Sequence, residues 1–320
     1  MTSTVAQSTL STAINSTLSM TSVPQTSMSP SDPKDQDDYH TVLLVIYSVV
    51  LLCGTISLSL MVHVMKSSAT STTSIAVLNL IFAHFIFLLT VPFRMYYYAT
   101  SQWSLSHGWC KMVSGMIHIH MYMSFVFYVI ILITRLLTFY HKADRLAYFQ
   151  RIHAFILSAL VWIAVLVMVP CIIHFSYGKK NNNGNKTDDN KTDDTKRCFR
   201  FGDNIESAKA ANYIISTLII VVAVVLTALQ ANVLWVLYKK HRQGCTSQQD
   251  FGAQLKSLCF ALVMVACFIP YHLFRLYYLE HIHLQNVNEV FLSFTTFNCL
   301  DMLTFLGRRT CNVCLLGRAI

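Results

Sequence analysis

The chain has 320 residues, of which 54% are apolar and only 12% charged, and its mean hydropathy is +0.48. Soluble globular proteins carry about 25% charged residues, so this composition excludes a soluble domain and indicates a membrane protein. The formal charge of +9 is not arranged as a nucleic-acid surface, so we expect no nucleic-acid partner and interpret the basic residues as loop charge that fixes the membrane topology.

Residues 1–40 are rich in Ser and Thr and contain almost no large apolar side chains. We expect them to form a disordered tail. The tail lacks the basic start and apolar core of a signal peptide, so we do not expect it to be cleaved. Asn15 begins a glycosylation sequon.

Seven apolar stretches follow, each long enough to cross a bilayer. The predicted spans are 41–65, 74–98, 108–140, 152–175, 208–238, 251–281 and 287–307. Because the short connections leave no room for a soluble domain, we predict an all-α membrane protein. Residues 41–307 would form a seven-transmembrane helix bundle, and residues 308–320 a short cytoplasmic tail.

The basic residues of the loops predict the orientation of the bundle. Lys66, the segments 141–151 and 239–242, and the Arg308-Arg309 pair all lie on the side opposite the N-terminus. The positive-inside rule makes that side cytoplasmic and places the N-terminus outside. The basic loop after the fourth span must also be outside, where a repeated Asn-Lys-Thr-Asp-Asp offsets its charge and supplies glycosylation sequons at Asn185 and Asn190.

Several short motifs occur in a characteristic order along the spans. They are Asn79-Leu80 with Ala83 in the second span, Trp162 and Pro170 in the fourth, Cys267-Phe268-Ile269-Pro270-Tyr271 in the sixth, and Asn298-Cys299-Leu300-Asp301 in the seventh. Over residues 41–310 the chain thereby resembles the class A, or rhodopsin-like, G-protein-coupled receptors. The segment 268–275 further resembles the nucleotide and lipid receptors of the purinergic branch.

The resemblance implies a multi-pass receptor of the plasma membrane, in contact with membrane lipids. An unknown extracellular ligand and a heterotrimeric G protein would be its partners. It also implies a disulfide between Cys110, at the start of the third span, and Cys198 in the second outer loop. We expect no enzymatic activity, because no catalytic motif occurs in the spans.

The chain departs from the family pattern at positions that take part in signalling. Thr134-Arg135-Leu136 replaces Asp-Arg-Tyr at the inner end of the third span. Met302 replaces a proline, so we expect the seventh span to lose its kink. One alternative is therefore an atypical or constitutively active receptor-like protein without conventional ligand-driven signalling. A transporter is the other alternative, although we find no inverted repeat.

Arg135 is the predicted inner switch. Asp250 lies twenty residues before Pro270, or roughly 30 Å along the same helix, which places it at the cytoplasmic face. We hypothesise that Asp250 pairs with Arg135 in the inactive state; the alternative is that Arg135 snorkels to the interface. Pro270 should kink the sixth span, and Phe268, beneath the ligand pocket, would couple ligand binding to that kink.

His84 stands where the family has an aspartate that binds sodium, a hard cation that prefers oxygen ligands. We therefore predict no sodium regulation, and a His84–Asp301 pair in its place. The alternative is a buried, hydrogen-bonded imidazole without a switching role.

The outer half of the bundle is the predicted ligand site. Its ionisable groups are almost all donors or potential cations, and arginine suits phosphate or carboxylate, so we expect an anionic ligand such as a nucleotide, a lipid acid or a lysophospholipid. The expected contacts are Arg275, then Arg94, with His118, His272, Tyr122 and Phe268. The alternative is that both arginines snorkel to the outer headgroups. Tyrosines at 96–98 and 277–278 should form an aromatic belt or line the pocket mouth.

The cysteines suggest no metal centre. No Cys-x-x-Cys pair accompanies a histidine pair, and most cysteines lie inside apolar stretches, so we expect neither a metal nor a cofactor. Cys311 and Cys314 follow the last span and are compatible with S-palmitoylation; two reduced cysteines without a role are the alternative.

Overall fold

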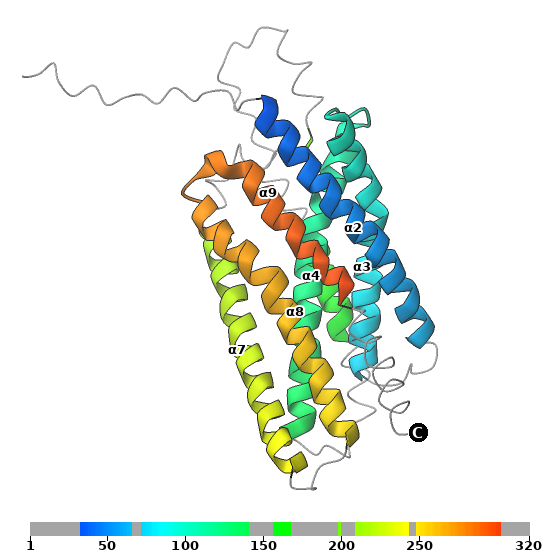
Figure 1. Ribbon diagram of the computed structural model, residues 1–320, viewed down its shortest axis with the longest axis vertical. Coiled ribbons are helices and arrows are strands. Elements are labelled where there is room, and N and C mark those ends of the chain that lie inside the picture. The colour runs from blue at the N-terminus through cyan, green and yellow to red at the C-terminus, as the bar shows by residue number, and fades with distance from the viewer. Residues whose placement is uncertain are drawn as a thin grey trace, which may run out of the picture. The chain divides into compact units, whose positions relative to one another are not determined.

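The computed structural model describes residues 33–65, 72–140, 156–167, 198–199, 209–242 and 248–301 (Figure 1). The chain divides into two units, Met1–Asp38 and Tyr39–Ile320, and the packing described below lies within the second. Its helices are α2 (Pro33–Met65), α3 (Thr72–Thr100), α4 (His107–Tyr140), Ile156–Val167, α7 (Lys209–Arg242), α8 (Gln248–Tyr278), η3 (Ile282–Leu284), α9 (Gln285–Phe294) and η4 (Thr295–Leu300).

Five of these helices are long and apolar enough to cross a membrane. The helix Ile156–Val167 lies in the predicted fourth span, and α9 with η4 lies in the seventh. The predicted all-α, seven-transmembrane fold is confirmed.

The first helix begins at Pro33, within the segment that we expected to be a disordered tail. Proline is favoured at the first position of a helix, where its missing N–H leaves no hydrogen bond unmade. The sequence that follows is acidic before it becomes apolar, and acidic residues are favoured near a helix N-terminus. These local preferences extend α2 before the apolar segment starts.

Helix α4 is the axis of the bundle and packs against α3, α7, α8 and η4. Helices α7 and α8 run side by side along most of their length (Figure 1). The opposite face of α7 exposes large apolar side chains such as Ile214, Leu218 and Val221. In water so large an apolar face would be an aggregation or interaction site, whereas in a bilayer it faces lipid.

Polar side chains connect α7 to α8 at three levels. Arg275 donates to Asn212 at 3.2 Å, His272 Nδ1 lies 3.2 Å from Ser216 Oγ, and Gln230 donates to Gln254 at 2.6 Å. Interhelical hydrogen bonds of this kind stabilise helix pairs in membranes, where the alternative is a polar group in hydrocarbon. They fix the register of α7 and α8 from the outer to the inner half.

The seventh span leaves α-helical geometry without a proline. Helix α9 continues into the 3-10 helix η4. Met302 itself lies outside the described residues, so the loss of the proline kink stays a prediction. Ser293, Thr295 and Thr296 each donate a side-chain hydrogen bond to the carbonyl three residues earlier, at 2.7, 2.7 and 2.6 Å. Hydroxyls that bond to backbone carbonyls compete with the helical pattern, and a 3-10 stretch within a helix often marks a hinge.

Trp162 tests how the fourth span is attached. Its Nε1–H donates to Asn79 Oδ1 on α3 at 2.9 Å. We expect Trp162→Phe to lower stability by about 1 kcal/mol. The melting temperature of the purified receptor should then fall by about 2–4 °C.

Trp235→Phe is the matched control, because Trp235 is 56% exposed on α7. Equal melting temperatures for the two variants would contradict a structural role for the Trp162–Asn79 bond.

Candidate functional site

The predicted disulfide between Cys110 and Cys198 is present. It fixes the outer loop to the first turn of α4 and brings the next residue, Phe199, over the bundle, where the ring is 3% exposed. Phe199 has a φ of 67°, a left-handed conformation that is disfavoured for a bulky residue. Contacts of its ring with Tyr97, Tyr98 and Trp103 offset that cost.

Arg94 is fully buried and lies next to Phe199. Its guanidinium carbon lies 4.5 Å from the centre of the Phe199 ring, and Nη2 donates to the carbonyl of Val113 at 3.0 Å. Its Nη1 lies 4.0 Å from a carboxylate oxygen of Glu289 on α9. Arg94 is therefore oriented into the bundle and has its own counter-charge, which the alternative of snorkelling did not anticipate.

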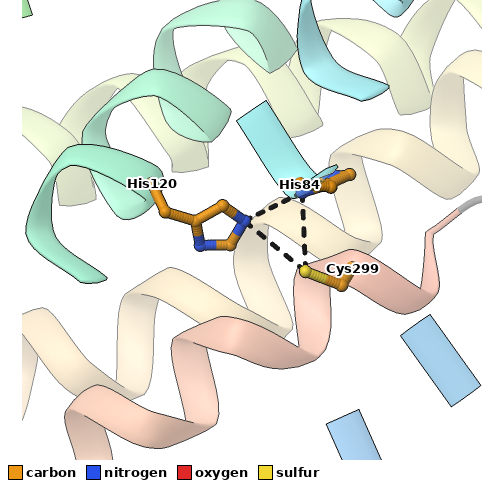
Figure 2. Close-up of side chains that lie close together, drawn as sticks. All are labelled: His84, His120 and Cys299. Carbon is orange, nitrogen blue, oxygen red and sulfur yellow. Dashed lines mark hydrogen bonds between the residues drawn. The ribbon is translucent and has the colours of Figure 1, made fainter. Parts of the chain in front are cut away.

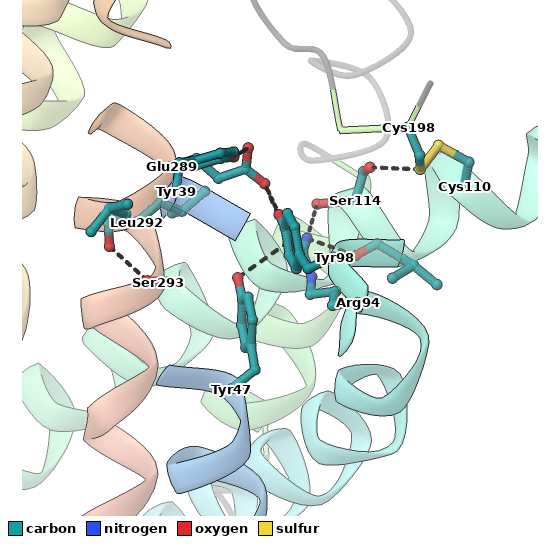
Figure 3. A network of polar contacts seen from close by, with 12 residues as sticks. Tyr39, Tyr47, Arg94, Tyr98, Cys110, Ser114, Cys198, Glu289, Leu292 and Ser293 are labelled. Atoms are coloured by element: carbon teal, nitrogen blue, oxygen red, sulfur yellow. Dashed lines mark hydrogen bonds and ion pairs between the residues drawn. A yellow bond between two sulfur atoms is a disulfide. The ribbon is translucent and has the colours of Figure 1, made fainter. Parts of the chain in front are cut away.

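Glu289 is held by two tyrosines in addition to Arg94. Tyr39 donates to one carboxylate oxygen at 2.5 Å, and Tyr98 donates to the other (Figure 3). Our sequence reading of the outer half overlooked this carboxylate. Only the structure identifies its helix face as buried, since Leu292 and Ser293, three and four residues further on, are buried as well.

The predicted aromatic belt is only partly correct. Tyr96 and Tyr277 are 43% and 53% exposed, as expected at an interface. In contrast, Tyr97, Tyr98 and Tyr278 are buried. Consecutive residues on a helix point about 100° apart, so a run of tyrosines places some rings on the exposed face of the helix and others on the face buried in the bundle.

Arg275 differs from Arg94 in its electrostatic surroundings. Its Nη2 donates to Asn212, and its guanidinium carbon lies 5.3 Å from the centre of the Tyr278 ring. Its Nε is buried without a hydrogen-bond partner among the described residues, and no carboxylate in that part of the chain pairs with it. Arg275 thus has partners that orient it but none there that neutralises it.

The nearby carboxylate of Glu280 is occupied elsewhere. It accepts hydrogen bonds from Tyr213 and, at 3.0 Å, from Lys209. These two hydrogen bonds hold the pKa of Glu280 below its ordinary value, so it remains a carboxylate paired with Lys209 at neutral pH.

The other predicted ligand contacts come from α4 and α8. His272 is 1% exposed on α8, three residues before Arg275, and its Nε2 has no hydrogen-bond partner among the described residues. His118 and Tyr122 are four residues apart on α4, and α8 packs against that helix. Arg94, in contrast, lies on α3 and is paired with Glu289.

A second polar cluster lies in the middle of the bundle. His84 Nδ1 is 2.8 Å from His120 Nε2, and Cys299 Sγ is 3.5 Å from each of these nitrogens (Figure 2). The other nitrogen of His84 lies 3.6 Å from Asp301 Oδ2, which places the predicted His84–Asp301 pair in the structure. Tyr128 donates to the same carboxylate oxygen at 2.6 Å.

Phe268, the sixth predicted contact, lies nearer to this middle cluster. It is fully buried in α8 and packs edge-on against Phe125 and Tyr128 of α4. Pro270 lies inside α8, and the kink that we expect at this proline stays a prediction. Phe268 consequently connects the proline-containing helix to Tyr128 and, through its hydroxyl, to Asp301.

The predicted inner switch consists of Arg135 and Asp250, and the structure describes the side chain of Arg135 but not that of Asp250. Arg135 is half-buried near the end of α4, and no ion pair to it occurs among the described residues. Asp250 lies in the first turn of α8, but its side chain is outside the described residues. The sequons at Asn15, Asn185 and Asn190, the cysteines Cys311 and Cys314, and the tail 308–320 are also outside them.

The apolar spans, the disulfide at the outer end of α4 and the two buried polar clusters define a seven-helix membrane receptor. Residues 55–304 match the family "7 transmembrane receptor (rhodopsin family)", and the chain belongs to that family. It is a multi-pass protein of the plasma membrane and a receptor rather than an enzyme.

The chain is similar to several curated receptors. The human protein "Probable G-protein coupled receptor 141" is 36% identical over 275 residues, which cover 82% of this chain and 87% of that protein. Mouse "Probable G-protein coupled receptor 34" is 23% identical over 85% of this chain and 75% of its own length. A purinoceptor of Xenopus laevis is 24% identical over 76% of this chain and 45% of its own length.

Glu289→Gln tests the buried ion pair. The substitution keeps the shape of the side chain but leaves the charge of Arg94 without its counter-charge, and breaking a buried pair in this way costs about 3 kcal/mol. We expect a large fall in the melting temperature of the purified receptor. The double variant Arg94→Met/Glu289→Leu should recover part of the loss, because it also removes the stranded charge.

Glu280→Gln is the matched control, since the Lys209–Glu280 pair is exposed and such pairs contribute little. An equal effect of Glu289→Gln and Glu280→Gln would show that the buried pair is not a structural anchor.

Proposed function

We propose that this receptor transmits the binding of an extracellular anionic ligand to intracellular heterotrimeric G proteins. The observation that carries the ligand class is Arg275. It is a partly buried guanidinium at the outer end of α8, and no carboxylate among the described residues pairs with it. A charge in such a place is costly, and a phosphate or carboxylate of a ligand would neutralise it.

The surroundings of Arg275 support an anionic rather than a cationic ligand. Glu289 is engaged by Arg94, and Glu280 by Lys209. His272 offers a further buried nitrogen, Nε2, that has no partner within the described residues. A relative also supports an anionic ligand, because one of the similar receptors is a purinoceptor. Nucleotides, lysophospholipids and lipid acids share the anionic group that this site suits.

Arg94 has a different part in this proposal. It is neutralised by Glu289 and covered by Phe199, so it shapes the wall of the site and the attachment of the outer loop. Arg275, with His118, His272 and Tyr122 nearby, makes the contacts with the ligand.

Arg275→Gln tests the ligand class. Cells that express the receptor would be treated with nucleoside di- and triphosphates, lysophospholipids and long-chain carboxylic acids, and G-protein activation would be recorded. For any agonist found, Arg275→Gln should raise the half-maximal concentration about 10- to 100-fold, because a charge-assisted hydrogen bond is lost.

The matched control is Lys209→Gln, which also removes one positive charge from the outer half but from a pair that is already neutralised. An agonist that is neutral or cationic, or one equally sensitive to both substitutions, would refute the anionic site.

On the inner side, the proposal is that Arg135 contacts the G protein and that Asp250 holds it in the inactive state. Arg135 is half-buried near the inner end of α4, the helix against which α8 packs, and Asp250 is in the first turn of α8. Because Thr134 replaces the usual adjacent aspartate, Asp250 is the counter-charge that we propose in its place.

A panel of G-protein activation sensors without any ligand tests this arrangement. Arg135→Ala should abolish basal coupling, and Asp250→Asn should raise it at least about 5-fold, since release of a lock shifts the population toward the active state. Lys239→Ala is the control, because Lys239 is a cation at the inner end of α7 that stacks on Trp235. Basal activity that is unchanged in both Arg135→Ala and Asp250→Asn would contradict the proposed switch.

A second candidate is an atypical receptor whose signalling is constitutive. The sequence Thr134-Arg135-Leu136 favours it, because Arg135 lacks the adjacent acidic residue that would restrain it. Strong basal coupling that Asp250→Asn does not increase would favour this candidate over a ligand-driven one.

The remaining proposals concern modification. Asn15, Asn185 and Asn190 carry glycans on the outer face, and Cys311 and Cys314 carry palmitoyl groups on the inner one. Each is proposed from its sequence context alone.

A further inference from the structure

We infer that His84, His120 and Cys299 form a binding site for a zinc ion in the middle of the transmembrane bundle. The three side chains come from α3, α4 and η4, and their ligand atoms all lie within 4.8 Å of one another (Figure 2). All three residues are buried. Two imidazoles and a thiol are a donor set that suits zinc and does not suit sodium.

Two of the three distances between the ligand atoms match a tetrahedral zinc site. With zinc bonds of about 2.05 Å to nitrogen and 2.3 Å to sulfur, nitrogen and sulfur ligands lie about 3.5 Å apart, and two nitrogens about 3.3 Å. The two nitrogen–sulfur distances here are both 3.5 Å. The nitrogen–nitrogen distance of 2.8 Å is shorter, and a small rotation of one imidazole opens it.

The surroundings of His84 have the arrangement that accompanies metal ligands. One ring nitrogen of His84 points to the other two ligands, and the opposite nitrogen lies 3.6 Å from Asp301. Metal-bound histidines usually direct their second nitrogen to a carboxylate, and that carboxylate is itself hydrogen-bonded. Tyr128 supplies this last bond at 2.6 Å.

Zinc binding would displace protons from the ligands and leave the cluster without net charge. In the absence of metal, the 2.8 Å contact between the imidazole nitrogens requires one of them to carry a proton. Both of these nitrogens must be unprotonated to bind zinc, so the proton moves to the opposite nitrogen of the ring that carried it, and the thiol proton of Cys299 is released to solvent. The two positive charges of the ion are then offset by the thiolate and by the carboxylate of Asp301, so the buried cluster is neutral.

A position for a fourth ligand lies on the same helix face. Ser124 is four residues after His120 on α4, is fully buried, and its hydroxyl has no hydrogen-bond partner among the described residues. A water held by this hydroxyl would supply the oxygen that completes a tetrahedron of two nitrogens, one sulfur and one oxygen. The ion would join the second, third and seventh spans.

The test uses the full-length receptor, purified under reducing conditions in nanodiscs, and measures the metal content by mass spectrometry. We expect about one zinc ion per wild-type receptor, and a more than 10-fold lower content in Cys299→Ser and His120→Phe. Asp301→Asn should weaken zinc binding about 10- to 100-fold without abolishing it. Cys259→Ser, a free cysteine on α8 outside the cluster, should retain full zinc.

Cobalt supplies a readout that does not depend on whether a variant folds. Co²⁺ in wild-type receptor should give a thiolate-to-cobalt charge-transfer absorption, which Cys259→Ser retains. Zinc should also raise the melting temperature of the wild type, because a ligand that binds only the folded state stabilises it.

Wild-type receptor that neither contains zinc nor gives the cobalt absorption would overturn the site. So would full zinc occupancy in a folded Cys299→Ser variant, or binding of copper(I) without zinc. None of these measurements involves G proteins or an agonist, so they separate this proposal from the proposed function.

Discussion

Lipid cannot solvate a charge, and this constraint explains how the buried ionisable groups of the receptor are arranged. Arg94 lies between helices with no exposure, so its charge has to be balanced inside the bundle. Glu289 supplies that balance from the seventh span, and Tyr39 and Tyr98 satisfy the carboxylate. The same constraint singles out Arg275, since among the described residues the available carboxylates are engaged elsewhere.

The middle of the bundle meets the constraint with a different chemistry. His84 replaces an acidic residue typical of the family, and the cluster gains His120 and Cys299 as neighbours. Two imidazole nitrogens and one sulfur around a single point, with Asp301 next to His84, suit a cation such as zinc. Oxygen ligands at the same place would instead select a hard cation such as sodium. The histidine at position 84 thus replaces an oxygen ligand with a nitrogen ligand, while any cation bound at the site would still need negative charge beside it.

The sequence predicted the features that depend on local composition or on a family pattern. The spans follow from length and hydropathy, and the Cys110–Cys198 disulfide and the His84–Asp301 pair follow from the resemblance. The sequence did not predict the clusters that form where side chains from different helices meet. No motif connects Cys299 to two histidines on other helices, and Glu289 is recognisable only once its helix face is known to be buried. The 3-10 segment was missed because hydroxyl bonds, rather than a proline, produce it.

The seventh span connects the two polar clusters through that 3-10 segment. Glu289 anchors α9 to the outer cluster, whereas Asp301, just after η4, anchors the span to the middle cluster. The 3-10 segment Thr295–Leu300 lies between these two attachments, and a 3-10 stretch within a helix often marks a hinge. Helix α8 reaches the same cluster, because Phe268 packs on Tyr128, whose hydroxyl binds Asp301. The middle cluster is therefore the place where the sixth span, through Phe268 and Tyr128, is connected to the seventh span, through Asp301.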